Sequence, residues 1–107
     1  MPSAGTGSSL RGISTHINGR HAFVHERVLE LIARETVLRD GVTFRKSDLA
    51  HRLGCQERTL NMAIARLRRD GLITVEAQHD ENGGQLANNY RATQSGIDWA
   101  QRLKERA

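Results

Sequence analysis

Apolar residues recur every three or four positions between about residues 21 or 22 and 40, which predicts a long first helix. Its apolar positions are Val24, Val28, Leu29, Leu31, Ile32, Ala33 and Val37. Gly41 follows them and is expected to end the helix. Because the apolar stripe is wider than a surface helix needs, this helix could contact both the core and a second subunit.

Two shorter amphipathic helices are expected on either side of Gly54, which can take the left-handed conformation of a tight turn. Ser47 is expected to cap the first of them, and the second covers about residues 56–70 and ends at Gly71. Their apolar positions are Leu49, Ala50, Leu53, Leu60, Ala63, Ile64 and Leu67. Two such helices joined by a short turn are typical of a helix-turn-helix.

Short β-prone runs flank these helices. Val42–Phe44 predicts a brief edge strand, and residues 72–77 and 86–93 predict a hairpin around a polar tip that contains Gly83 and Gly84. A last helix is expected over about residues 95–106, capped by Ser95 and with Ile97, Ala100 and Leu103 on one side.

This order of elements predicts a mainly α fold with a small β hairpin (α+β), a winged helix-turn-helix with a three-helix core, a wing and a C-terminal helix. With 107 residues the chain is long enough for one such domain, over residues 21–107. Residues 1–20 are rich in Gly, Ser and Thr and are expected to form a flexible tail. Leu10, Ile13 and Ile17 are exceptions that could pack on a partner subunit.

Charge is concentrated in the helix-turn-helix. Between Arg45 and Arg69 seven basic and two acidic residues give a net charge of +5, whereas the whole chain carries +4. A basic segment of this kind is compatible with a polyanionic partner such as DNA, although a solvated helical face would explain it as well.

Several function classes have little support in the sequence. A single cysteine, Cys55, excludes an intrachain disulfide framework and favours a reducing cytoplasm, and we expect no membrane partner because no apolar run approaches the roughly 18 residues of a membrane span. The histidine and cysteine pairs His21/His25 and His51/Cys55 lack further ligands, so we expect neither a metal nor a cofactor. The absence of a phosphate loop, a nucleophile elbow and a paired carboxylate site argues against an enzyme.

A family resemblance follows from the segment SDLAHRLGCQERTLNMAIARLRRDGLITVEAQHDENGGQLANNYRAT, residues 47–93. It resembles the winged helix-turn-helix modules of bacterial transcription regulators and of phage or plasmid replication proteins. The features that carry the resemblance are Leu49 with Ala50, Leu53 with Gly54, the run from Arg69 to Ile73, and Asn89 with Tyr90. The following YRATQSGIDWAQRL is similar to the junction after the wing in MarR and PadR type regulators, which implies dimerisation through helices outside the reading unit.

If the helix over residues 56–70 reads double-stranded DNA, its N-terminal half should contact base edges. The expected base contacts are Gln56, Arg58, Thr59, Asn61 and Met62. Amide side chains pair with adenine, arginine pairs with guanine, and methyl groups contact thymine. The expected contacts to the DNA backbone are Arg45, Lys46, Ser47, Arg52 and Arg66. Arg68 and Arg69 lie at the helix end, where interaction with the helix dipole explains their charge.

Two functions therefore remain open. The first is a small transcriptional regulator of bacterial, phage or mobile-element origin, acting in the cytoplasm as a homodimer on a partly palindromic DNA site. The second is a winged-helix adaptor that binds protein, such as a replication component or a phage inhibitor. The acidic wing, with Glu76, Asp80 and Glu81, and the uncharged pair Asn61 and Met62 favour this second function.

Overall fold

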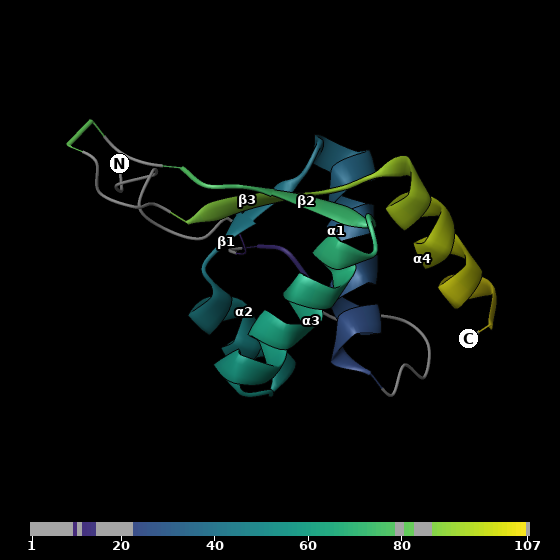
Figure 1. Cartoon of the computed structure of the whole chain (residues 1–107), viewed down its shortest axis with the longest axis horizontal. Helices are drawn as coiled ribbons and strands as arrows, with labels where there is room; N and C mark the ends of the chain where they lie inside the picture. Colours follow the sequence, from purple (N-terminus) through teal and green to yellow (C-terminus); the bar gives the residue numbers. More distant parts are fainter. Residues whose placement is uncertain (1–9, 11, 15–22, 79–80, 83–86, 107) are drawn as a thin grey trace.

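The computed structural model describes residues 10, 12–14, 23–78, 81–82 and 87–106 of the 107. Within these residues four helices and three strands follow one another, with α1 at the centre of the molecule and α4 on the side of α1 away from α2 (Figure 1). The elements are α1 (Val24–Arg39), β1 (Val42–Phe44), α2 (Lys46–Leu53), α3 (Glu57–Arg69), β2 (Ile73–Glu76), β3 (Asn88–Ala92) and α4 (Gln94–Arg106). The expected α+β winged helix-turn-helix is confirmed.

The apolar stripes of the helices meet in one core. α1 contributes the most to it, from Val28 to Ala33, and α2 and α3 contribute the residues expected from their spacing. The rings of Phe44 on β1 and Tyr90 on β3 stack with centroids 4.0 Å apart and close the core beneath the sheet. Burial of these stripes supplies the main free energy that holds the helices together.

The sheet is antiparallel in the order β1-β3-β2, so the short strand after α1 pairs with the second strand of the hairpin. Val42 lies opposite Tyr90, and Val75 lies opposite the same residue on the other side. Thr36 connects α1 to this sheet, because its hydroxyl accepts a hydrogen bond of 2.8 Å from the backbone N–H of Ala92. The wing is thereby fixed to the central helix.

The helix ends differ from the sequence prediction in three places. α2 begins at Lys46 with Arg45 at its N-cap and no side-chain cap, so Ser47 does not cap it. Thr93, rather than Ser95, caps α4, because its hydroxyl accepts a hydrogen bond of 3.1 Å from the N–H of Gly96. Asp40 takes the left-handed conformation after α1, with φ of 65°, and Gly41 follows it with φ of 132°. Local spacing places helices well, but it does not decide which polar residue meets the free N–H groups.

The turn between α2 and α3 has the expected geometry, since Gly54 ends α2 with φ of 73°. A close approach also fixes the start of α4, because a Cβ at Gly96 would collide with the carbonyl group of Leu72. The Thr93 hydroxyl donates a further hydrogen bond of 2.7 Å to the carbonyl of Gly71. α4 is therefore anchored to the turn that follows α3.

The N-terminal segment contributes to the core of its own chain. Leu10 is 1% exposed and Ile13 is 8% exposed, so the expectation that they pack on a partner subunit is not what the structure shows. Their apolar side chains fill space in the core cluster, which spacing alone could not reveal from so short a run. Ile17, the third exception in the expected tail, lies outside the described residues.

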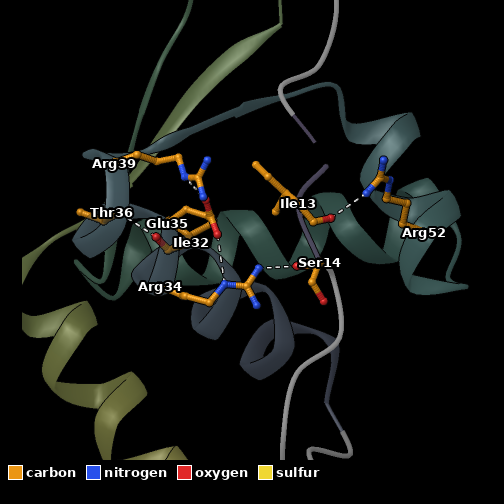
Figure 2. A network of polar contacts seen from close by, with 8 residues as sticks. All are labelled: Ile13, Ser14, Ile32, Arg34, Glu35, Thr36, Arg39 and Arg52. Carbon is orange, nitrogen blue, oxygen red and sulfur yellow. Dashed lines mark hydrogen bonds and ion pairs between the residues drawn. The ribbon is translucent and has the colours of Figure 1, made fainter. Parts of the chain in front are cut away.

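Arginine side chains hold this segment in place (Figure 2). Arg52 donates a hydrogen bond of 2.9 Å to the Ile13 carbonyl, and Arg34 donates one to the Ser14 carbonyl. Arg34 is itself 3.0 Å from the carboxylate of Glu35, a residue only 2% exposed, whose other oxygen lies 2.8 Å from Arg39. This last contact lacks hydrogen-bond geometry, since Glu35 Oε1 has no hydrogen-bond partner, and it acts as an ion pair. We call Arg34, Glu35, Arg39 and Arg52 the arginine clamp.

Candidate nucleic-acid interface

Helix α3 buries one face and exposes the other. Its buried residues are Leu60, Ala63, Ile64 and Leu67. The five expected base contacts, Gln56, Arg58, Thr59, Asn61 and Met62, are all exposed. Met62 is 65% exposed, which leaves its side chain accessible to a partner.

Helical geometry orders these residues around α3. With about 100° per residue, Arg58 and Met62 lie opposite the buried stripe, whereas Thr59 and Asn61 lie on its two flanks. Arg69 continues the line of Arg58 and Met62 about two turns beyond Met62, and it is exposed. Interaction with the helix dipole explains the charge of Arg69, and its spacing of seven from Met62 also predicts its place on this outer face.

The expected backbone contacts at the start of α2 line a hollow. Arg45, Lys46 and Ser47 surround it together with Glu57 from the start of α3 and Tyr90 from β3. A single carboxylate therefore stands opposite two cationic side chains. The start of α2, which has no side-chain cap, adds partial positive charge to the hollow.

Tyr90 lies at the buried end of this hollow and was not expected as a lining residue. Its ring is fully buried, and neither its hydroxyl nor the Asn88 Oδ1 has a hydrogen-bond partner. Burial raises the pKa of the Tyr90 phenol, while Asn88 and the charge of Arg68 act in the opposite direction. The phenol therefore remains neutral and serves the packing on Phe44 rather than as a charged group.

The structure separates Arg52 from the other expected backbone contacts. Its guanidinium turns to the N-terminal segment and binds the Ile13 carbonyl as part of the arginine clamp, whereas Arg45, Lys46 and Ser47 gather at the other end of α2. Sequence spacing could not distinguish these two environments, because they depend on a segment 39 positions away in the chain.

Arg66, the last expected backbone contact, lines an open groove between α3 and the beginning of α1. The groove has a volume of about 740 Å³, and its α1 side is formed by Phe23, Val24 and His25. Arg66 also lies 3.9 Å from Asp70, in an exposed ion pair at the limit of contact. Surface pairs of this kind contribute little to stability, so Arg66 can readily change partner.

His25 has a perturbed environment in this groove and was not among the expected site residues. Burial lowers its pKa below 6.5 and the positive charge of Arg66 lowers it further, while Glu26 and Asp70 oppose the shift. Its ring lies 5.5 Å from that of Phe23, which is 59% exposed. The lowered pKa favours the neutral imidazole, which lies beside an exposed aromatic ring and a cation.

The wing carries acidic residues on its described part. Glu76 at the end of β2 and Glu81 beyond it are exposed. Asp80 and His79 lie outside the described residues. Beside α3, the described acidic side chains include Glu57 at the hollow and Glu26 and Asp70 near the groove, together with the basic Arg45, Lys46, Arg66 and Arg69.

The described residues give little support for a metal site or a membrane-spanning helix. No three His, Cys, Asp or Glu side chains among them gather in a way that could hold a metal ion. Within the same part of the chain, no helix has the length and apolar character required to cross a membrane.

Solved structures with the same fold include two MarR-family winged-helix regulators. An apo double mutant of Lactococcus lactis ZitR is 16% identical over 77% of this chain and 55% of its own, with a TM-score of 0.56. A MepR mutant from a multidrug resistant S. aureus clinical isolate is 22% identical over 76% of this chain and 53% of its own, also with a TM-score of 0.56. The chain thus spans about half the length of these two proteins.

A third structure matches along nearly its whole length. It is a proposed DNA-binding protein from Ralstonia eutropha, 19% identical over 79% of this chain and 98% of its own, with a TM-score of 0.53. No protein-family model matches the sequence, and neither does any curated protein. At these identities the matches establish the winged helix-turn-helix fold.

Proposed function

We propose that the protein is a small, non-enzymatic transcriptional regulator that binds double-stranded DNA in a sequence-specific manner with α3. The observation that carries this proposal is the exposed face of α3, on which Arg58, Asn61 and Met62 stand clear of the core. A helix with a polar outer face of this kind fits the major groove, which is about 12 Å wide. The fold shared with ZitR, MepR and the Ralstonia eutropha protein supports the same function.

In this proposal different side chains on α3 contact different bases. Arg58 donates two hydrogen bonds to guanine, and Asn61 and Gln56 pair with adenine. Met62 and Thr59 contact the methyl group of thymine. Contacts of this type distinguish one base pair from another, so they determine specificity.

Affinity for every sequence comes from a second set of residues. Arg45, Lys46 and Ser47 present cationic and hydroxyl groups at the uncapped start of α2, where backbone N–H groups also point outward. Arg66 approaches a phosphate from the other side of α3. Arg52 belongs to this set only if DNA replaces its bond to Ile13.

A homodimer fits the apolar surface on the far side of α1. Val37 and Leu38 are more than half exposed, and they border a groove whose α4 side includes Ile97 and Ala100. Two copies joined through this surface would place two α3 helices on one face of the DNA, as a partly palindromic site requires. Sedimentation at several protein concentrations measures the mass in solution and tests this part separately.

Selection of binding sites from a random duplex library tests the DNA function. Purified protein should enrich one sequence family, and fluorescence anisotropy on that sequence should show an affinity that falls steeply with salt. Arg58→Ala should relax base preference by about 1–3 kcal/mol, whereas Lys46→Ala should weaken all sequences alike. Equal affinity for every sequence, or no binding at about 50 mM salt, would contradict the proposal.

The exposed acidic residues of the wing favour one competing function, a protein-binding adaptor. Glu76 and Glu81 repel a DNA backbone and suit a basic protein surface. Under this alternative the library selection enriches nothing, and Glu76→Lys reduces binding of the partner. Under the first proposal Glu76→Lys increases DNA affinity, because a repulsive charge near the duplex is replaced by an attractive one.

A further inference from the structure

The groove between the beginning of α1 and α3 contains both cationic and apolar side chains. Its cationic groups are Arg66 and Arg69 on α3, both exposed. Its apolar groups are Phe23 on α1 and Met62 on α3, which are 59% and 65% exposed. Neither Phe23 nor Met62 belongs to the core cluster or to the partly buried residues packed against it.

A DNA strand carries groups that complement both the cationic and the apolar side chains. Its phosphates are anionic, and its deoxyribose rings present C–H groups that pack against aromatic and thioether surfaces. The groove also lies directly beside the face of α3 that bears Arg58 and Met62. A duplex bound to that face would place one of its strands along the groove.

We infer that this groove binds one sugar–phosphate strand of the duplex, with Phe23 packing on deoxyribose and His25 joining Arg66 on a phosphate. The inference rests on the proposed DNA function and extends it to α1, which lies outside the helix-turn-helix. It assigns roles to two residues, Phe23 and His25, for which sequence spacing provided no signal. Both contact the backbone, so they contribute to affinity for every sequence rather than to base preference.

Uptake of a proton by His25 on DNA binding distinguishes a phosphate contact from a merely structural role of this residue. In the free protein the groups facing His25 are Glu26 on α1 and Arg66, Arg69 and Asp70 on α3, and burial together with Arg66 lowers its pKa. A phosphate in the groove opposes the charge of Arg66 and raises that pKa. Since the bound state then takes up a proton, DNA affinity rises as pH falls through the bound-state pKa and levels off below the free-state pKa.

The test measures affinity for a duplex of random sequence at low salt, by fluorescence anisotropy between about pH 8 and pH 5.5. The full chain should bind about three to ten times more tightly at the acid end, which corresponds to a pKa rise of about half to one unit. His25→Gln should lose most of this gain. His51→Gln is the matched control, because His51 lies on α2 outside the groove, and it should keep the gain.

A second variant tests the apolar contact without titration. Phe23→Ala should weaken binding to all sequences by about threefold while keeping the pH dependence. Because Phe23 is exposed and precedes the first turn of α1, this change should leave the thermal midpoint unaltered. Thermal unfolding of each variant confirms that a folded protein is being compared.

The outcomes separate the inference from the proposed function. If the full chain fails to bind any duplex, the proposed DNA function fails. If it binds DNA but His25→Gln retains the pH dependence and Phe23→Ala binds normally, the groove does not hold a strand and the inference is overturned.

Discussion

The arginines of this protein are used in two different ways on two sides of the same fold. In the arginine clamp, Arg34 and Arg39 contact the buried carboxylate of Glu35, and Arg52 binds the carbonyl of Ile13. On the exposed face of α3, Arg58 and Arg69 have no ion-pair or hydrogen-bond partner among the described residues. A basic side chain with an internal partner stabilises the fold, and one without such a partner is available to an external anion.

This difference explains why net charge is a poor guide to individual residues. The segment from Arg45 to Arg69 is strongly basic, yet Arg52 within it belongs to the clamp. Conversely, the lowered pKa of His25 favours its neutral form, yet this residue lies within the groove beside α3. Four experiments with variants test the contrast, from the largest expected effect to the smallest.

Removal of the buried carboxylate should have the largest effect. Glu35→Ala leaves Arg34 and Arg39 without their shared partner, and we expect the free energy of unfolding to fall by about 2–4 kcal/mol. Urea denaturation followed by circular dichroism measures it. Glu105→Ala, on the exposed side of α4, is the control and should change stability by less than about 0.5 kcal/mol. Equal stability of the two variants would show that the clamp contributes nothing.

Truncation of Leu10, in the N-terminal segment, should have the second-largest effect on stability. Leu10→Ala removes a side chain that is 1% exposed, and a loss of about 2–3 kcal/mol in the free energy of unfolding is expected. The same truncation at Leu38, which is 64% exposed, provides the comparison and should be nearly neutral. If Leu10→Ala were as stable as Leu38→Ala, the segment would not belong to the folded unit.

Two arginine variants compare the two regions directly. Arg52→Ala should lower the free energy of unfolding by about 1 kcal/mol, because a hydrogen bond to a carbonyl is lost, and should leave the salt dependence of DNA binding unchanged. Arg69→Ala should leave stability unchanged and reduce the slope of log affinity against log salt by about one. Denaturation and anisotropy on the same preparations measure both quantities. A reversed pattern would mean that the clamp arginine, and not the α3 arginine, contacts DNA.

The smallest effect concerns the dependence of stability on pH. Because folding lowers the pKa of His25 below 6.5, the unfolded chain binds a proton more readily, and stability falls as pH decreases through that range. The loss of stability is complete once the pH lies below the folded-state pKa of His25. His25→Gln should lack this part of the acid destabilisation, whereas His51→Gln should retain it. Denaturation midpoints at about pH 8 and pH 5.5 compare the three proteins, and parallel changes in all of them would exclude His25 as the cause.

Much of the fold was predictable because its signals are local. The spacing of Leu60, Ala63, Ile64 and Leu67 determines which face of α3 is buried, and the conformational freedom of Gly54 places the turn before it. The exposed positions expected on α3 follow from the same period. Their contacts with bases stay a prediction, because a helical face indicates accessibility but not its partner.

The remaining features depend on contacts between distant parts of the chain. Thr93 rather than Ser95 caps α4, because the turn after α3 holds Thr93 close to the helix start. The groove of Phe23 and His25 exists only because α1 crosses α3 at that point. Neither feature has a period or a motif that a sequence pattern could reveal.

The amino-acid sequence by itself determined the order of helices and strands, the buried face of each helix and the basic character of the helix-turn-helix, since these depend on neighbours within a few residues. Only the tertiary structure decided that Leu10 and Ile13 enter the core and that Arg52 binds the carbonyl of Ile13. The physical reason is that an arginine acts according to the partner that the folded chain brings to it, and that partner can lie anywhere in the sequence.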